Sequence, residues 1–302
     1  MNPIDVVIKS LEIAYGAVLE KGDAGKKTVS NAIDISTEAD KIAGMAVIEY
    51  LNTVKFIGVV YTEEQGEVQL SKGGRFSVVM DDLDGTKNFK EGFGMLPHGC
   101  ILGIFEGINP RFSDCVASGY LDFPSGNLFF AEKNKGAYLI RKYASGERVK
   151  ERIKTSGRKT LIGGENPTIL LDIYALGSMA PHFAKYSGRA WLGDFRASAA
   201  HMALIASGSA DLFIQGDNAF NPNKRKTAEE IGPGFLIIKE AGGSILMWSG
   251  RRIDGEFVGL DKKKTWHLIY AATEELALEF VREMRRIPEV AEYLRTKMFD
   301  RQ

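Results

Sequence analysis

The sequence predicts an α+β protein built as a layered α/β/α/β/α sandwich, with helices between two sheets and outside them. Apolar residues recur at helical spacing near both ends of the chain. Strand-like runs separated by Gly, Pro and Asn turns fill much of residues 56–140, and helical and strand-like segments alternate in the second half. With 302 residues, 44% of them hydrophobic, the chain is long and apolar enough for two packed subdomains.

Residues 1–150 are predicted to form an N-terminal α+β subdomain. Apolar residues at helical spacing indicate an opening amphipathic helix that ends near Gly22, and a second helix is expected from Ser36 or Thr37. The turn residues between the runs that follow are typical of a meandering, largely antiparallel sheet. Its strands are expected at residues 56–61, 75–80, 99–105, 115–121, 127–131 and 137–140.

Residues 151–302 are predicted to form a C-terminal α/β subdomain, with the charged stretch 141–154 as the seam between the two. Because short strands and helices alternate here, a second sheet with its own helices is expected. Strands are expected at 160–163, 211–214 and 267–271, and helices at 198–207, 235–241 and 274–298.

Charge and apolar patterning exclude several classes of protein. Lysine and arginine together number 39, as do aspartate and glutamate, so the chain lacks the basic field that nucleic acid or an anionic membrane requires. No apolar run approaches a membrane span, and Asp5, Lys9 and Glu12 interrupt the first helix, so no signal peptide is expected. A cytoplasmic protein is therefore expected. Cys100 and Cys115 lack metal-type spacing and are expected to be buried free thiols, with a disulfide or a nucleophile as alternatives.

The most informative segment is residues 78–89, VVMDDLDGTKNF, in which an apolar strand ends in three carboxylates within four positions. Aspartates are poor strand formers and repel one another, so their gathering here predicts a bound cation. Asp81 and Asp84 lie three residues apart around a turn and can face a common centre with the carbonyl of Leu83. Hard oxygen ligands of this kind favour Mg²⁺.

Gly85 and Thr86 follow the carboxylates directly. A glycine where a strand passes into a helix lets backbone N–H groups approach a ligand, and the N-terminus of that helix favours a phosphate oxygen. The alternative interpretation is a surface turn, since Asp and Gly are common turn residues.

Two other acidic clusters precede this segment. Glu63 and Glu64 close the strand expected at 56–61, and Glu64 can reach the aspartates if the two strands are neighbours; a solvated turn is the alternative. Residues 36–40, Ser-Thr-Glu-Ala-Asp, fit the capped N-terminus of a helix, and they can serve the site at the same time.

The order STEAD, Glu pair, DDLDGTKNF, ADLF and EAGG resembles the magnesium-dependent, lithium-sensitive phosphatases typified by inositol monophosphatase and its archaeal fructose-1,6-bisphosphatase relatives. The similarity covers most of the chain, including residues 119–139. It implies an inositol monophosphatase-like fold and a homodimer. It also implies hydrolysis of a small sugar or polyol phosphate, inositol 1-phosphate or fructose 1,6-bisphosphate, by water that metal ions activate.

The resemblance also implies roles for individual residues. Glu64 and Thr86 would orient the attacking water, and Asp40 would be the hydrogen-bond partner of Thr86. No covalent phosphoenzyme is needed, so the lack of a Ser-His-Asp or Cys-His set is no objection. The ligands of two or three Mg²⁺ ions would be Glu64, Asp81, the Leu83 carbonyl, Asp84 and an acid from the distal half of the chain.

Glu230 is the predicted distal acid, because it falls at the family's metal-binding position when residues are counted back from the EAGG motif. A capping box that begins at Thr227 is the alternative, in which Glu230 serves the helix terminus. Pro233 argues against that box, since it prefers a first turn and predicts that the regular helix begins near Ile231. Asp217 is the rival acid.

Arg196 and Ala197 replace the family's Gly-Ser at the start of the substrate-binding helix. Arg196 can bind a second phosphate through a bidentate contact, or it can point to solvent. Residues 224–226, Lys-Arg-Lys, offer the same choice between a second phosphate and solvent. The predicted substrate-binding residues are Gly85, Thr86, Arg196, Ala197 and Ser198.

Two other functions stay open. A 3′-phosphoadenosine 5′-phosphate phosphatase is the alternative enzyme, since its relatives also carry an Asp-x-Leu-Asp-Gly-Thr-Lys string. A metal-binding relative that has lost turnover through the changes at Glu230 and Arg196 is the alternative from another class.

Overall fold

The fold is seen in a computed structural model. The described residues are 1–20, 27–29, 35–92, 94–146, 149–161, 165–177, 180–183, 190–216, 228–258 and 266–297.

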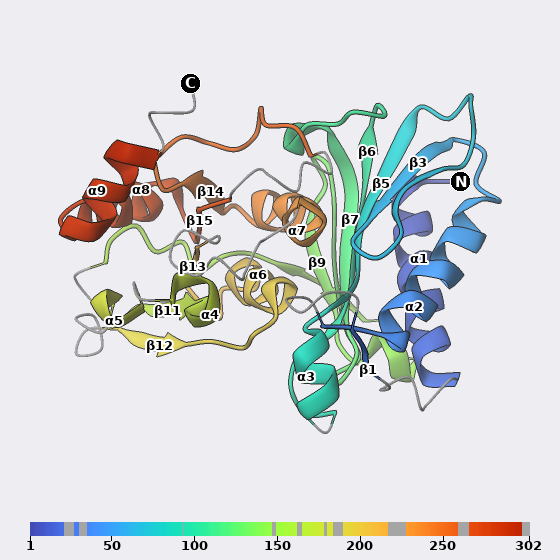
Figure 1. Ribbon diagram of the computed structural model, residues 1–302, viewed down its shortest axis with the longest axis horizontal. Coiled ribbons are helices and arrows are strands. Elements are labelled where there is room, and N and C mark those ends of the chain that lie inside the picture. The colour runs from blue at the N-terminus through green and yellow to red at the C-terminus, as the bar shows by residue number, and fades with distance from the viewer. Residues whose placement is uncertain are drawn as a thin grey trace.

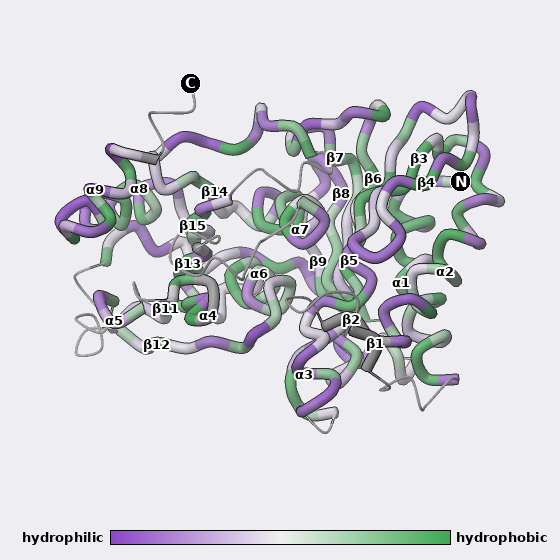
Figure 2. Tube along the Cα trace, viewed as in Figure 1, coloured by the Kyte–Doolittle hydropathy of each residue, from purple (hydrophilic) through white to green (hydrophobic). Residues whose placement is uncertain are grey.

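Two sheets lie roughly parallel to each other, with helices between them and on both outer sides (Figure 1). The α/β/α/β/α sandwich expected from the sequence is confirmed. In Figure 2, α6 between the sheets is largely hydrophobic, whereas α9 at the edge is largely hydrophilic. The helices α1 (Pro3–Glu20) and α2 (Glu38–Leu51) cover the outer face of the large sheet. Between the sheets lie α6 (Ser198–Ala206) and α7 (Ala228–Glu240), and outside the small sheet lie α8 (Glu274–Met284) and α9 (Pro288–Lys297).

The large sheet has the order β10-β9-β8-β7-β6-β5-β3-β4. Neighbouring strands from β5 to β10 are antiparallel, while β3 is parallel to β5. The predicted meander is therefore confirmed, and the stretch expected as a seam contributes β10 at one edge. The strands are β3 (Ile57–Thr62), β4 (Gly66–Gln69), β5 (Phe76–Asp84), β6 (Gly99–Glu106), β7 (Cys115–Asp122), β8 (Asn127–Glu132), β9 (Gly136–Ile140) and β10 (Lys150–Ile153).

The small sheet is mixed and has the order β12-β11-β13-β15-β14. Its strands are β11 (Thr168–Leu171), β12 (Trp191–Gly193), β13 (Leu212–Gln215), β14 (Ser244–Met247) and β15 (Leu268–Ala271). A separate two-stranded ribbon and several short helices complete the described elements. These are β1 (Lys27–Val29), β2 (Ile35–Thr37), α3 (Thr86–Glu91), α4 (Ile173–Leu176), α5 (Ala180–Phe183) and the 3₁₀ turns Phe112–Asp114 and Tyr143–Ser145.

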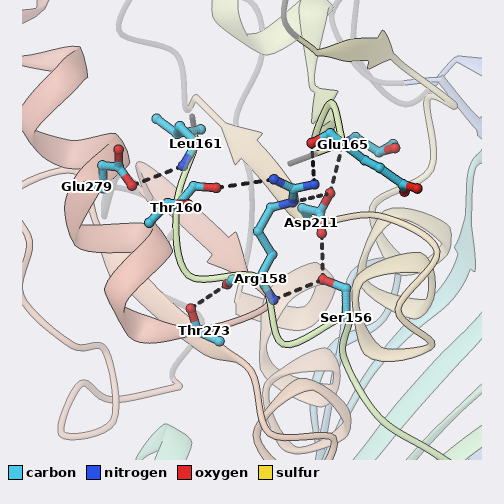
Figure 3. A network of polar contacts seen from close by, with 9 residues as sticks. Ser156, Arg158, Thr160, Leu161, Glu165, Asp211, Thr273 and Glu279 are labelled. Carbon is cyan, nitrogen blue, oxygen red and sulfur yellow. Dashed lines mark hydrogen bonds and ion pairs between the residues drawn. The ribbon is translucent and has the colours of Figure 1, made fainter. Parts of the chain in front are cut away.

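The strand expected at residues 160–163 is wrong for the part described, because Thr160 and Leu161 lie in an irregular segment. Side chains hold this segment in place (Figure 3). Arg158 approaches Asp211 at 3.4 Å and donates to the carbonyl of Glu165, and Ser156 Oγ donates to Asp211 Oδ1 at 2.5 Å. The acid of the ADLF motif therefore anchors the chain between the two sheets.

Two helix boundaries also differ from expectation. The long C-terminal helix is divided into α8 and α9, and α9 begins at Pro288, which has no N–H to continue the preceding helix. α7 begins at Ala228, not near Ile231, and contains Pro233 in its second turn. The earlier start places Glu230 inside the first turn.

Three buried apolar clusters separate the layers. One lies between α1, α2 and the large sheet, one between the sheets around α6 and α7, and one outside the small sheet under α8 and α9. Val78 and Met80 of β5 belong to the first cluster and Val79 to the second, as alternation along a strand requires. Cys100 and Cys115 are buried free thiols, as expected. Among the described helices, none is long and apolar enough to cross a membrane.

Candidate metal centre

A β-bulge at the end of β5 arranges the aspartates. Asp81 is paired with Ile101 of β6 and Asp84 with Gly99, so three steps on β5 face two steps on β6. Residues three apart in a regular strand point to opposite faces, but one extra residue returns both aspartates to the same face. The Leu83 N–H donates to Asp81 Oδ1 at 3.1 Å. The turn expected at this string is therefore a bulged continuation of the strand.

Three buried acids converge on that face. Asp81, Asp84 and Glu230 each offer one carboxylate oxygen, and these oxygens lie within 4.8 Å of one another. Burial raises the pKa of Asp81 well above its usual range, and the charges of Glu63, Asp84 and Glu230 raise it further. Buried acids so placed are unfavourable unless a cation compensates them, so the three residues fit a hard divalent ion. The rival acid, Asp217, lies outside the described residues.

The start of α6 holds one of these carboxylates. The N–H groups of Ser198 and Ala199 donate to the two oxygens of Asp84, at 3.0 and 2.7 Å respectively. Free N–H groups at a helix N-terminus favour negative charge, so α6 both orients Asp84 and stabilises its ionised form. Ala197 is the N-cap residue. The helix predicted to bind substrate is therefore in direct contact with the acidic triad.

The two glutamates after β3 act on different aspartates of β5. Among the carboxylates that raise the pKa of Asp81, Glu63 has the largest effect. The charge of Glu64 acts instead on Asp82, and the Glu64 N–H donates to Asp82 Oδ2 at 3.3 Å. Neither Glu63 nor Glu64, the predicted metal ligand, is a member of the triad, and of the two it is the charge of Glu63 that acts on Asp81. The sequence carried no signal to choose between adjacent glutamates.

Thr86 and Asp40 meet as expected. The hydroxyl of Thr86 lies 3.0 Å from Asp40 Oδ1 and 3.0 Å from the Leu83 carbonyl oxygen, and donates to them. Gly85, the residue between Asp84 and Thr86, has φ +81°, and a Cβ there would lie 2.8 Å from the carbonyl oxygen of Pro97. Only glycine suits that backbone and that space. α3 begins at Thr86, so the bend after the bulge brings its hydroxyl back to the strand end.

Asp82 is a further buried carboxyl, on the opposite face of β5. It lies against α2, where a Cβ on Gly44 would be 2.5 Å from its Oδ1. Burial raises the pKa of Asp82 well above its usual range. The sequence showed three equivalent aspartates, and the bulge assigns them to two different environments.

Arg196 lies two residues before the Ser198 N–H, with a left-handed backbone of φ +54°. Its guanidinium Nη1 is 3.6 Å from Glu91 Oε2 at the end of α3. The basic residues 224–226 and Thr227, which was the expected start of a capping box, lie outside the described residues.

Comparison with known proteins agrees with the fold. The chain is 28% identical over 282 residues to a fructose-1,6-bisphosphatase/inositol-1-monophosphatase of Thermococcus kodakarensis, covering 93% of this chain and 95% of that protein. An IMPase of Thermotoga maritima superposes with a TM-score of 0.70 at 19% identity, covering 97% and 100% of the two chains. A fructose-1,6-bisphosphatase of Leishmania major gives 0.72 at 17% identity, covering 92% and 94%.

The two solved structures share the fold at low identity, and a family model matches the sequence itself. The model described as the inositol monophosphatase family matches residues 4–289. That match includes the strand end, the bulge, the start of α6 and the first turn of α7. The chain belongs to the inositol monophosphatase family.

Proposed function

We propose that this chain is a Mg²⁺-dependent phosphatase that hydrolyses the phosphomonoester of a small sugar or polyol, such as inositol 1-phosphate or fructose 1,6-bisphosphate. The observation that carries the proposal is the buried triad of Asp81, Asp84 and Glu230. Family membership and a relative named for both activities support it. A bound cation makes three converging, ionised carboxylates favourable, and a phosphate ester brings a matching negative charge.

The triad, with the Leu83 carbonyl and Glu63, would hold the metal. When bound, divalent ions lower the pKa of a coordinated water and neutralise charge on the phosphate. The start of α6 stabilises the ionised form of Asp84, and this is the form that binds a cation. Glu64 was the expected ligand, and we assign its place to Glu63 because the charge of Glu63 acts on Asp81.

Thr86 would orient the attacking water. Its hydroxyl proton is directed to Asp40, which is buried and fixed at the start of α2. The lone pairs of the Thr86 oxygen are then free of that proton and can accept a hydrogen bond from water. A water held so has its own lone pair turned away from Thr86, toward the substrate. Asp40 is thus a positioning residue for Thr86.

Gly85 and the start of α6 would form the substrate side of the site. Ala197 Cβ is 3.2 Å from where a Cβ on Gly85 would lie, so the two segments adjoin without side chains between them. Both segments adjoin Asp84 of the triad, so a phosphate bound at the triad would lie beside them. Gly85, Ala197 and Ser198 therefore remain the predicted substrate-binding residues.

Phosphate release with and without Mg²⁺ tests the proposal. The panel contains inositol 1-phosphate, fructose 1,6-bisphosphate and 3′-phosphoadenosine 5′-phosphate. We expect Mg²⁺-dependent release from at least one of the first two. Release from the adenosine bisphosphate alone would identify a nucleotide phosphatase instead, and Mg²⁺ binding without release from any of the three would identify a metal-binding relative without turnover.

A further inference from the structure

Arg196 has a backbone that side chains rarely adopt. Among the described residues, the non-glycine residues with positive φ are Asn134, Lys142 and Arg196. Asn134 lies in the tight turn between β8 and β9, and Lys142 in the turn after β9, where left-handed residues are common. Arg196 instead precedes the helix whose N–H groups hold Asp84. A strained backbone beside a functional site is a reason to look for a role of its side chain.

Hydrogen bonds fix the segment that presents Arg196. The Arg196 N–H donates to Asp194 Oδ1 at 2.8 Å, and the Phe195 N–H donates to Nε2 of the buried His201 at 2.8 Å. The Phe195 carbonyl accepts from Nδ2 of the buried Asn88 in α3 at 2.6 Å. These contacts use the main-chain groups of Phe195 and the N–H of Arg196. Its position is therefore set by α3 and α6, the helices that begin at the metal centre.

The guanidinium of Arg196 has little structural role by comparison. Its side chain is 39% exposed, and Glu91, its ion-pair partner, is 54% exposed at a distance of 3.6 Å. Exposed ion pairs of this length contribute little to stability, so the pair does not account for an arginine at a left-handed position. The backbone that carries this charge lies two residues before the Ser198 N–H that binds Asp84, and among the described residues its ion-pair partner is the solvent-accessible carboxylate of Glu91.

We propose that Arg196 determines substrate specificity by binding a second phosphate of the substrate, away from the ester that is hydrolysed, in exchange for Glu91. The planar guanidinium offers two parallel N–H donors that match phosphate oxygens. Its fixed backbone reduces the entropy lost when the contact forms. The inference rests on the proposed function, and it assigns the chain to sugar bisphosphates in preference to monophosphates.

The variant Arg196→Gly tests this inference with little risk to the fold, because glycine adopts φ +54° without strain. The matched control is Lys142→Gly, which also removes an exposed cation from a left-handed residue, φ +48°, in the turn after β9, four strands from β5. Thermal unfolding should show that neither variant is less stable than the parent.

Kinetics should separate the two substrates. Loss of a charged, bidentate contact should raise KM for fructose 1,6-bisphosphate relative to KM for inositol 1-phosphate by roughly 10-fold or more, with kcat for the bisphosphate changed less than KM. Glu91→Gln should shift the ratio the other way, because the competing carboxylate is removed. Lys142→Gly should leave both substrates unchanged. An equal change for both substrates in Arg196→Gly, or no change in the ratio, would overturn the inference.

A binding measurement keeps this inference distinct from the proposed function. Fructose 6-phosphate is the product that retains the second phosphate, and its binding to the metal-free protein can be followed by calorimetry, because without Mg²⁺ the metal centre neither holds nor hydrolyses its phosphate. We expect Arg196→Gly to weaken it by roughly 10-fold and Lys142→Gly to leave it intact. Equal affinity in the parent and Arg196→Gly would overturn the role of Arg196, whatever the outcome of the hydrolysis panel.

Discussion

The two faces at the end of β5 both carry aspartate side chains, but these side chains have different neighbours. On one face Asp81 and Asp84 converge with Glu230 from α7, and on the other Asp82 packs against α2. All three aspartates are buried, and burial raises the pKa of both Asp81 and Asp82. Chemical identity and burial therefore do not distinguish them; the neighbours do.

Those neighbours give the faces different functions. The face of Asp81 and Asp84 gathers three acids from two separate elements, β5 and α7, so it concentrates negative charge for a cation. The face of Asp82 leaves no room, because a Cβ added to Gly44 of α2 would lie 2.5 Å from Oδ1 of Asp82. Asp82 accepts the Glu64 N–H, so it fixes the turn that carries both glutamates. The face of Asp81 and Asp84 would therefore bind the cation, and the face of Asp82 would hold the turn in place.

The largest predicted difference between the faces is in activity. Asp84→Asn removes a ligand charge and one acceptor for the N–H groups of α6, so phosphate release should fall by about 100-fold or more. Asp82→Asn makes the same substitution on the packed face, and its rate of phosphate release should be roughly tenfold or more above that of Asp84→Asn. Both should be measured at saturating Mg²⁺, with circular dichroism to confirm folding. Equal losses in the two variants would remove the distinction between the faces.

The distal acid should show the next largest effect. Glu230→Gln keeps the size of the side chain but removes a triad charge, so the Mg²⁺ concentration for half-maximal activity should rise by roughly 10- to 100-fold. Glu229→Gln changes the adjacent buried acid, and Asp217→Asn changes the rival of the sequence prediction; both should shift it less. If Asp217→Asn alone weakens the Mg²⁺ dependence, the assignment of Glu230 is wrong.

A smaller effect, on stability alone, is expected at the packed face. An alanine at Gly44 would place its Cβ 2.5 Å from Asp82 Oδ1 and 2.6 Å from Gln65 Oε1, so Gly44→Ala should destabilise the protein by about 1–3 kcal/mol. Gly16→Ala in α1 is the matched control, because no atom lies within 4 Å of its new Cβ. That substitution should stabilise by about 0.5–1 kcal/mol.

Chemical denaturation measures both glycine variants. Neither should change the Mg²⁺ concentration for half-maximal activity. A stable Gly44→Ala protein would show that α2 does not confine Asp82, and an altered Mg²⁺ dependence would show that the two faces are coupled.

The smallest expected effect concerns the two cysteines, which should not react with an alkylating reagent in the folded protein. Cys100 packs in the α1–α2 cluster and Cys115 in the cluster between the sheets, and burial raises the pKa of both thiols well above the usual range. The thiolate is the reactive form, so iodoacetamide at pH 8 should leave the folded protein unmodified by mass spectrometry. The protein in denaturant, as the control, should be modified at both positions. Modification of Cys100 alone in the folded state would mean that the packed face opens.

Much of the fold could be predicted from sequence because its signals are local. The meander follows from apolar runs separated by turn residues, and the six predicted strands begin and end close to the predicted residues apart from the longer β5. The edge strands β4 and β10 were not predicted. The strand at 160–163 was wrong because an apolar pair next to glycines looks like a strand, while the contacts of Arg158 and Asp211 that hold the segment are 53 residues apart. Side-chain contacts at that separation leave no periodic pattern.

The site was predictable in composition but only partly in geometry. Three aspartates at a strand end indicate a cation, and counting along the motifs selects Glu230, which the structure places with Asp81 and Asp84. The prediction that Asp81 and Asp84 face a common centre is confirmed, but the bulge that brings them together depends on how β5 pairs with β6 and replaces the turn that was expected. The same limit applies to Glu63 and Glu64, whose directions depend on one residue of register. The left-handed backbone of Arg196 has no sequence signal at all.

The most direct test is to locate the ion. Crystals grown with Mn²⁺ in place of Mg²⁺ should give anomalous difference density bounded by oxygens of Asp81, Asp84 and Glu230, with none beside Asp82. Full occupancy at Mn²⁺ concentrations that support phosphate release would establish the acidic triad as the metal centre. Density elsewhere, or none at the triad under those conditions, would contradict it.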